Sequence, residues 1–285
     1  LTGGDQLFPA MHAAIARAHH DVWLATYIFH DDPAGRAMAD ALIAAARRGV
    51  RVRVVVDGFG SKATLATLHR WLDGSGVALA VFRPIDRWYA WLQPGQLRRL
   101  HQKLLATDTE MAFVGGINFS EDQLESSGVK AKEDYAVRIQ GPAVERIHHF
   151  VRQALEPVQR QLKEEPIPHR VPRRDGAVTS SATAPKTQTL PGNAEVAFVT
   201  RDNRFHRTDI EHAYRMAIRA ARDTVLIANA YFFPGYRLLR DLRRAASRGV
   251  TVQLILQNDP DVPIARLAGR LLYDILLKDG VTIHE

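Results

Sequence analysis

One stretch of this chain gathers residue types that could act together on a phosphodiester. In chain order they are His101, Lys103, Asp108, the pair Gly115-Gly116, and Asn118. A neutral imidazole can act as a nucleophile or accept a proton, and lysine and asparagine side chains can donate hydrogen bonds to phosphate oxygens. The types and their spacing therefore suit phosphodiester chemistry.

The residues around this stretch predict a β-hairpin. Residues 100–107 are typical of a strand, 108–110 of a turn, and 111–114 of a second strand. Side chains two apart on a strand point to the same face, so His101 and Lys103 should be neighbours. A histidine and lysine at this spacing alone more often mark a solvated strand edge; the glycine pair, which permits close approach of a ligand, and Asn118 favour a site.

The spacing resembles the hallmark of the phospholipase D superfamily, His-x-Lys-x4-Asp-x6-Gly-(Ser/Gly)-x-Asn. Within it, the chain is most similar to bacterial cardiolipin synthases of the type without membrane spans. The stretches that carry this resemblance are Phe29-His30-Asp31-Asp32, Val56-Asp57-Gly58-Phe59-Gly60-Ser61, Asp134-Tyr135-Ala136-Val137-Arg138 and Asn229-Ala230-Tyr231-Phe232-Phe233-Pro234-Gly235-Tyr236. It covers the whole chain apart from a central segment.

The resemblance implies a duplicated α/β fold, with a β-sheet core flanked by helices in each lobe, and a two-step mechanism. His101 would attack phosphorus, a second histidine would protonate the leaving alkoxide, and an alcohol or water would resolve the phosphohistidine. Lys103 and Asn118 would bind the phosphoryl oxygens, so neither a metal nor another cofactor is needed. Asp108 would fix loop geometry more than it takes part in chemistry.

A histidine in either role needs an acceptor for its far ring nitrogen. In the family, an acidic residue on the strand after each motif reaches the histidine of the opposite half. Asp134 occupies that place, with Glu133 as the less favoured choice. A surface carboxylate at the start of a strand is an equally good interpretation.

The elements before the motif predict a parallel βαβ unit. Residues 22–29 form an apolar run of strand length, Asp32 and Pro33 can begin a helix that stops at Gly49, and residues 50–56 form the next strand. The same order returns with a strand over 225–233, a helix over 238–248 and a strand over 250–256. The offset of about 200 residues indicates an internal duplication.

The chain is expected to divide into a first lobe over 1–156, a mobile Pro-rich linker over 157–194, and a second lobe over 195–285. A lid over the active site is the alternative for the linker. His206, His212 and His284 lack a lysine two places on, so the second motif is expected beyond Glu285. The second lobe would then be incomplete and this chain alone inactive, unless two chains share one site as a homodimer; an inert protein is the third alternative.

The composition favours polyanionic partners. The net charge is +7, the pI is about 9.8, and the absence of cysteine excludes disulfides, thiolate metal sites and cysteine nucleophiles. No apolar run approaches the ~20 residues of a membrane span. Residues 82–92 interleave aromatic and basic side chains, which suits a lipid surface, packing on the core, or single-stranded nucleic acid.

The leading hypothesis is a phosphatidyl transferase that makes cardiolipin from phosphatidylglycerol or a related donor. The resemblance implies an anionic phospholipid substrate and a peripheral location on the cytoplasmic side of a bacterial membrane, and it disfavours nucleic acid as a partner. A phospholipid hydrolase or nuclease of the same superfamily is one alternative. A non-catalytic lipid-binding module is another.

Overall fold

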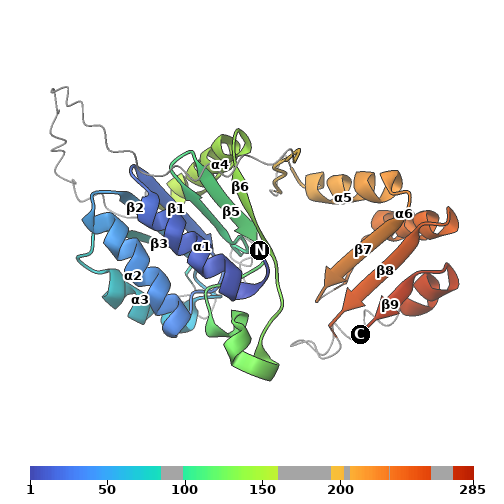
Figure 1. Ribbon diagram of the computed structural model, residues 1–285, viewed down its shortest axis with the longest axis horizontal. Helices are drawn as coiled ribbons and strands as arrows, with labels where there is room; N and C mark the ends of the chain where they lie inside the picture. The colour runs from blue at the N-terminus through green and yellow to red at the C-terminus, as the bar shows by residue number, and fades with distance from the viewer. Residues whose placement is uncertain (85–98, 160–193, 202–205, 231, 258–271) are drawn as a thin grey trace, which may run out of the picture. The chain divides into compact units, whose positions relative to one another are not determined.

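The computed structural model describes residues 1–84, 99–159, 194–201, 206–230, 232–257 and 272–285 (Figure 1). These residues belong to two compact units, Leu1–Phe198 and Val199–Glu285. Residues 160–193 of the expected Pro-rich linker and residues 85–92 of the aromatic and basic segment lie outside the described residues. The expected division at 156 and 194 therefore stays a prediction.

The first unit is built on a six-stranded sheet of order β3-β2-β1-β4-β5-β6. Its strands are β1 (Asp21–Thr26), β2 (Arg51–Asp57), β3 (Ala78–Phe82), β4 (Leu104–Thr107), β5 (Met111–Gly115) and β6 (Ala136–Gln140). β1, β2 and β3 pair in parallel, whereas β4, β5 and β6 join the sheet antiparallel. The expected mixed α/β fold and the parallel β1–β2 pair are confirmed.

Helices cover both faces of this sheet (Figure 1). α1 (Gly3–Arg17), α2 (Pro33–Arg47) and α3 (Leu65–Leu72) pack on one face, and α4 (Ala143–Gln159) packs on the other. β1 alternates between the two cores, with Leu24 in the first and Trp23 in the second. Burial on both faces explains why its sequence is continuously apolar.

The beginning of α2 follows the sequence-based expectation. Asp32 is its N-cap, and the carboxylate accepts a hydrogen bond from the backbone N of Gly35 at 2.8 Å. Pro33 occupies the first helical position, where its missing N–H leaves no bond unmade.

Two strands are shorter than expected, and the difference matters for the site. β4 begins at Leu104, so His101 and Lys103 lie in the approach to the strand instead of inside it, and β1 ends at Thr26. The backbone N of Leu100 donates to the Asp57 carboxylate, and that of Phe29 donates to the Ser61 hydroxyl. Side chains far away in the sequence thus accept hydrogen bonds from the backbone N–H groups that a longer strand would have used in its ladder.

The second unit repeats the parallel half of the first. It contains α5 (Asp209–Ala220), β7 (Thr224–Asn229), α6 (Tyr236–Ser247), β8 (Thr251–Leu256) and β9 (Thr282–His284). Its parallel sheet has the order β7-β8-β9, matching β1-β2-β3. Gly49 and Gly249 both have φ of +88°, in the left-handed region that ends a helix at glycine. The internal duplication is confirmed at the level of backbone conformation.

Candidate active site

The candidate site lies at one edge of the first sheet. Strand register places the carboxyl ends of β1, β2 and β5 beside the beginnings of β4 and β6. The residues that directly follow or precede those ends are Tyr27, Lys103, Gly116 and Tyr135, and Asp57 is the last residue of β2. Ligands of open α/β sheets bind outside the carboxyl ends of parallel strands, so this edge is the expected place for chemistry.

His101 and Lys103 are neighbours, as the sequence predicts. The Lys103 Nζ lies 3.2 Å from Nδ1 and 3.3 Å from Nε2 of His101, and it also donates to the His101 carbonyl oxygen at 3.2 Å. Lys103 is 6% exposed, whereas His101 is exposed. A buried ammonium group thus lies directly beside an imidazole that solvent or a ligand can reach.

This arrangement favours a neutral imidazole. Burial first, and then the charge of Lys103, lowers the pKa of His101, while Asp57 and Asp134 oppose the change. Burial lowers the pKa of Lys103 to about 8, against the opposing charge of Asp134. At neutral pH the site therefore pairs a neutral histidine, which a nucleophile requires, with a lysine that is still mainly charged.

Tyr27 forms an aromatic wall of the site that the motif does not include. Its ring centroid lies 4.8 Å from the His101 ring centroid and 5.4 Å from the Lys103 Nζ. Gly60 makes this placement possible, because a Cβ there would meet the Tyr27 ring at 2.9 Å. No signal in the sequence pointed to Tyr27, because the residue lies inside the apolar run of residues 22–29 that was expected to be a strand.

Asn118 uses its amide oxygen in a contact within the protein. Its Oδ1 accepts a hydrogen bond from the backbone N of Ile28 at 3.2 Å. Because the partner is an N–H group, the oxygen must face Ile28 and the NH₂ group must point elsewhere. The amide NH₂ group is not used in this contact, and it is the part of Asn118 that could donate to a phosphate oxygen.

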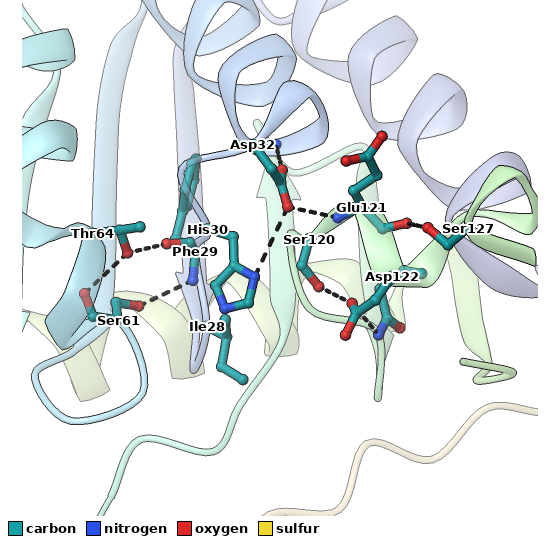
Figure 2. Close-up of polar contacts among 12 residues, drawn as sticks. Ile28, Phe29, His30, Asp32, Ser61, Thr64, Ser120, Glu121, Asp122 and Ser127 are labelled. Atoms are coloured by element: carbon teal, nitrogen blue, oxygen red, sulfur yellow. Dashed lines mark hydrogen bonds and ion pairs between the residues drawn. The ribbon is translucent and has the colours of Figure 1, made fainter. Parts of the chain in front are cut away.

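The loop that follows β1 is fixed by contacts with two other loops (Figure 2). The backbone of Phe119 bonds to that of Ile28 and His30, at 3.2 and 2.8 Å. From the other side, the Ser61 Oγ accepts from the Phe29 N at 3.1 Å, and the Thr64 hydroxyl donates to the Phe29 carbonyl oxygen. The loop that carries Tyr27 is thereby tied to the segment that carries Asn118.

Asp32 extends the same network beyond its helix cap. While Oδ1 accepts from Gly35, Oδ2 accepts from the backbone N of Glu121 at 2.7 Å and lies 3.9 Å from the His30 Nδ1 (Figure 2). One carboxylate therefore starts α2 and holds the loop after Asn118.

Asp108 lies at the opposite end of the sheet from His101. Four residues of β4 separate it from Lys103, about 16 Å of extended chain. Its carboxylate accepts from the backbone N of His19, His20 and Asp21 at 3.0, 2.8 and 2.8 Å. Burial alone would raise the pKa of Asp108, but these three bonds outweigh it and hold the pKa below its usual value. This placement fits the expected role in loop geometry.

Asp134 lies close enough to His101 and Lys103 to affect the pKa of each. Its carboxylate also explains why position 116 is a glycine. A Cβ on Gly116 would collide with both carboxylate oxygens of Asp134, and one on Gly115 would lie 2.5 Å from the carbonyl oxygen of Tyr135. The glycines therefore make room for protein atoms, where the sequence suggested room for a ligand. Glu133 instead accepts from the Tyr135 hydroxyl at 2.8 Å on the surface.

Asp57, the last residue of β2, is the second site residue that sequence reasoning missed. It is fully buried and accepts a 2.7 Å hydrogen bond from the backbone N of Leu100, directly before His101. The sequence placed Asp57 in a stretch of family resemblance without a role. Its partner is 43 residues away, which no local pattern could indicate.

The described part of the chain contains neither a metal-binding cluster nor a helix that could span a membrane. Within it, no three histidine, aspartate or glutamate side chains gather in a way that could bind a metal ion. No helix in the same residues has the length and apolar character needed to cross a bilayer. The expectation of a site without a cofactor stays a prediction.

Comparison with known proteins identifies close relatives. The sequence model of a family described as "Cardiolipin synthase, PLD-like domain" matches residues 11–154 and 214–285. Cardiolipin synthase B of Escherichia coli (strain K12) is 41% identical over 285 residues, which are 100% of this chain and 65% of that protein. Cardiolipin synthase 1 of Bacillus anthracis is 26% identical over 296 residues, 100% of this chain and 54% of that protein. The chain thus spans less than two thirds of these curated relatives.

A solved structure shares the fold. The crystal structure of phosphatidylserine synthase from Haemophilus influenzae Rd KW20 aligns with a TM-score of 0.62 at 12% sequence identity. The alignment covers 100% of this chain and 73% of that chain. At this identity the likeness concerns the fold alone.

Proposed function

The chain belongs to the cardiolipin synthase family of proteins with a phospholipase D-like domain, and on this premise we propose that it serves phosphatidyl transfer between phospholipids. The product would be cardiolipin, formed from phosphatidylglycerol or a related donor. The observation that carries this proposal is the contact between His101 and the buried Lys103, whose Nζ lies 3.2 Å from the His101 Nδ1.

In the first step, a ring nitrogen of His101 attacks the phosphorus of the donor. A phosphorus–nitrogen bond forms, the bond from phosphorus to the departing glycerol oxygen breaks, and an acid protonates that oxygen. In the second step, a hydroxyl of the acceptor lipid attacks phosphorus, loses its proton to a base, and releases the histidine. A second His-x-Lys motif, in the same protein or in a partner copy, would provide the acid and the base.

Lys103 and Asn118 would meet the charge that builds on the phosphoryl oxygens. Fixed donors stabilise a transition state most when they need not reorganise, and both side chains are held by protein contacts before substrate arrives. The Asp134 carboxylate would keep Lys103 charged, since its charge raises the pKa of that lysine against the effect of burial.

The proposed location is the cytoplasmic face of a bacterial membrane, with the protein bound peripherally to anionic lipid. The net charge of +7 supports an attraction to such a surface. A basic protein could equally attract nucleic acid, so the substrate must be tested directly.

The test uses the protein expressed from its complete gene and vesicles of labelled phosphatidylglycerol. We expect labelled cardiolipin and free glycerol, and we expect His101→Ala to abolish both. His69→Ala, which changes an exposed histidine on α3, is the matched control and should leave the rate unchanged.

The same reaction discriminates the alternatives. Phosphatidic acid without cardiolipin would show a hydrolase, and cleavage of single-stranded DNA in a parallel incubation would show a nuclease. Vesicle binding with no product in any incubation would show a non-catalytic lipid-binding module. Cardiolipin formation that survives His101→Ala would also overturn the proposal.

A further inference from the structure

Asp57 is a buried carboxylate at the carboxyl end of β2, beside the proposed nucleophile. Its side chain is 0% exposed, so its charge must be met by protein donors. Oδ1 accepts from the backbone N of Phe59 and Gly60 at 2.9 and 3.1 Å. Oδ2 accepts from the backbone N of Leu100 at 2.7 Å.

These bonds connect β2 to the residues that lead into His101. Leu100 directly precedes the histidine, and the residue before it, Arg99, has its Nη1 3.6 Å from Oδ1 of Asp57. The same Arg99 nitrogen donates to the carbonyl oxygen of Arg83 at 3.1 Å, just after β3. Two consecutive residues before His101 are therefore attached to the ends of two parallel strands.

The placement is needed because His101 lies outside the sheet. β4 begins at Leu104, so no strand ladder fixes the backbone of residues 100 and 101. The hydrogen bond from Leu100 to Asp57 supplies the restraint that a ladder bond would otherwise give. A bond to a charged acceptor is about twice as strong as one between neutral groups.

We propose that Asp57 is a positioning residue for His101, holding the backbone before the histidine against the end of β2 and facing its imidazole with a fixed negative charge. The relevance of this role to catalysis rests on the proposed function. The hydrogen bond between Leu100 and Asp57 does not depend on that proposal. The charge also acts on the imidazole, because Asp57 raises the pKa of His101 against the lowering by burial and Lys103.

A purely structural role must be separated from a positioning role, and Asp108 is the matched control. Like Asp57, it is a buried aspartate that accepts hydrogen bonds from three backbone N–H groups, but at the opposite end of the sheet. Replacing either residue with asparagine removes one charge and one acceptor oxygen at nearly constant volume. Only the substitution at Asp57 should alter the titration of His101.

The experiment compares Asp57→Asn and Asp108→Asn in the full chain by NMR. The imidazole signal of His101 is assigned by its loss in His101→Gln, and its titration is followed in each variant. We expect the His101 pKa to fall further in Asp57→Asn, by about 0.5 or more, and to stay at the wild-type value in Asp108→Asn. We expect hydrogen exchange at the Leu100 amide to become about tenfold faster in Asp57→Asn only.

An unchanged His101 titration together with unchanged Leu100 exchange in a folded Asp57→Asn would overturn the proposal. If that variant does not fold, hydrogen exchange in the wild-type protein still tests the contact. Its Leu100 amide should be protected from exchange as strongly as the amides of β4. Exchange as fast as in an exposed loop would refute the contact.

Neither readout requires a substrate, so both remain valid if the protein makes no cardiolipin. Where transfer is observed, Asp57→Asn should lower kcat more than it raises KM. The acid limb of its pH profile should move in the direction of the His101 titration.

Discussion

His101 and Lys103 lie so close that the lysine affects the protonation of the histidine. Burial first, and then the charge of Lys103, lowers the pKa of His101, and burial lowers the pKa of Lys103 to about 8. A nucleophile and a phosphate-binding cation need opposite protonation states, and this pair provides both only over a limited range of pH.

If His101 is the nucleophile and Lys103 the phosphate-binding cation, as proposed, phosphatidyl transfer should have a bell-shaped pH dependence. His101 must lose its proton to attack, and its pKa lies below 6.5, so kcat/KM should rise with pH through a range below 6.5. Lys103 must keep its proton, so the rate should fall again as pH rises through about 8. Initial rates on phosphatidylglycerol vesicles across this range would measure both limbs.

Lys103→Arg supplies the control, because a guanidinium stays charged across the whole range. Its alkaline limb should disappear even if its maximal rate is lower. An alkaline limb that stays near pH 8 in this variant would show that another group titrates there.

At the scale of elements, the sequence predicts which helices and strands form better than it predicts where they begin and end. β1, α2 and β2 follow from an apolar run, a capping aspartate and a glycine stop, all of which act locally. The strand expected over residues 100–107 was four residues too long, since Leu100 bonds to Asp57 and not to a neighbouring strand. Contacts that join residues far apart in sequence leave no periodic pattern.

The candidate site divides in the same way. His101, Lys103 and Asn118 could be found because their spacing is short and their types are distinctive. Tyr27 and Asp57 could not, because each reaches the site from the end of a different strand. Both lie at the carboxyl end of a buried parallel strand, and this shared feature can be recognised only when the strand ends and the sheet order are known.

Asp32 joins two elements, and its removal should show an effect on each. Asp32→Ala removes the α2 cap and also the acceptor for the backbone N of Glu121. We expect a loss of about 1–3 kcal/mol in the free energy of unfolding, measured by urea denaturation. Amide hydrogen exchange in the loop after Asn118 should also become faster.

Asp40→Ala is the control on the same helix. Asp40 pairs with Arg36 on the exposed face of α2, at 2.9 Å, and such pairs stabilise by about 0.5 kcal/mol or less. Equal losses for the two variants would mean that the contacts of Asp32 carry no special weight.

At the scale of the whole molecule, the duplication preserves the backbone and changes the side chains. Gly49 and Gly249 end equivalent helices with the same φ, and Val50 and Val250 each donate to a helix carbonyl at 3.2 Å. The contact between the helices differs. At the offset of 200, Ala41 of α2 corresponds to Asp241 of α6, which is 1% exposed and binds Arg215 at 2.7 Å.

The positive charge of the whole chain leads to the last prediction. With a net charge of +7, the protein should bind vesicles that contain phosphatidylglycerol and should not bind vesicles of neutral lipid. Because the attraction acts through solvent, binding should fall steeply between ~0.05 M and ~0.5 M salt, where screening becomes strong. Co-sedimentation with vesicles at several salt concentrations would measure it.

His101→Ala separates this attraction from catalysis. The variant removes a side chain that is neutral at pH 7, so it should bind vesicles with the same salt dependence while it loses transfer. Binding that persists at ~0.5 M salt would point to apolar insertion as the main contact, against an electrostatic one. Weaker vesicle binding by His101→Ala would mean that the end of the sheet that carries His101 contacts the lipid surface. His101 would then contribute both to membrane binding and to the reaction.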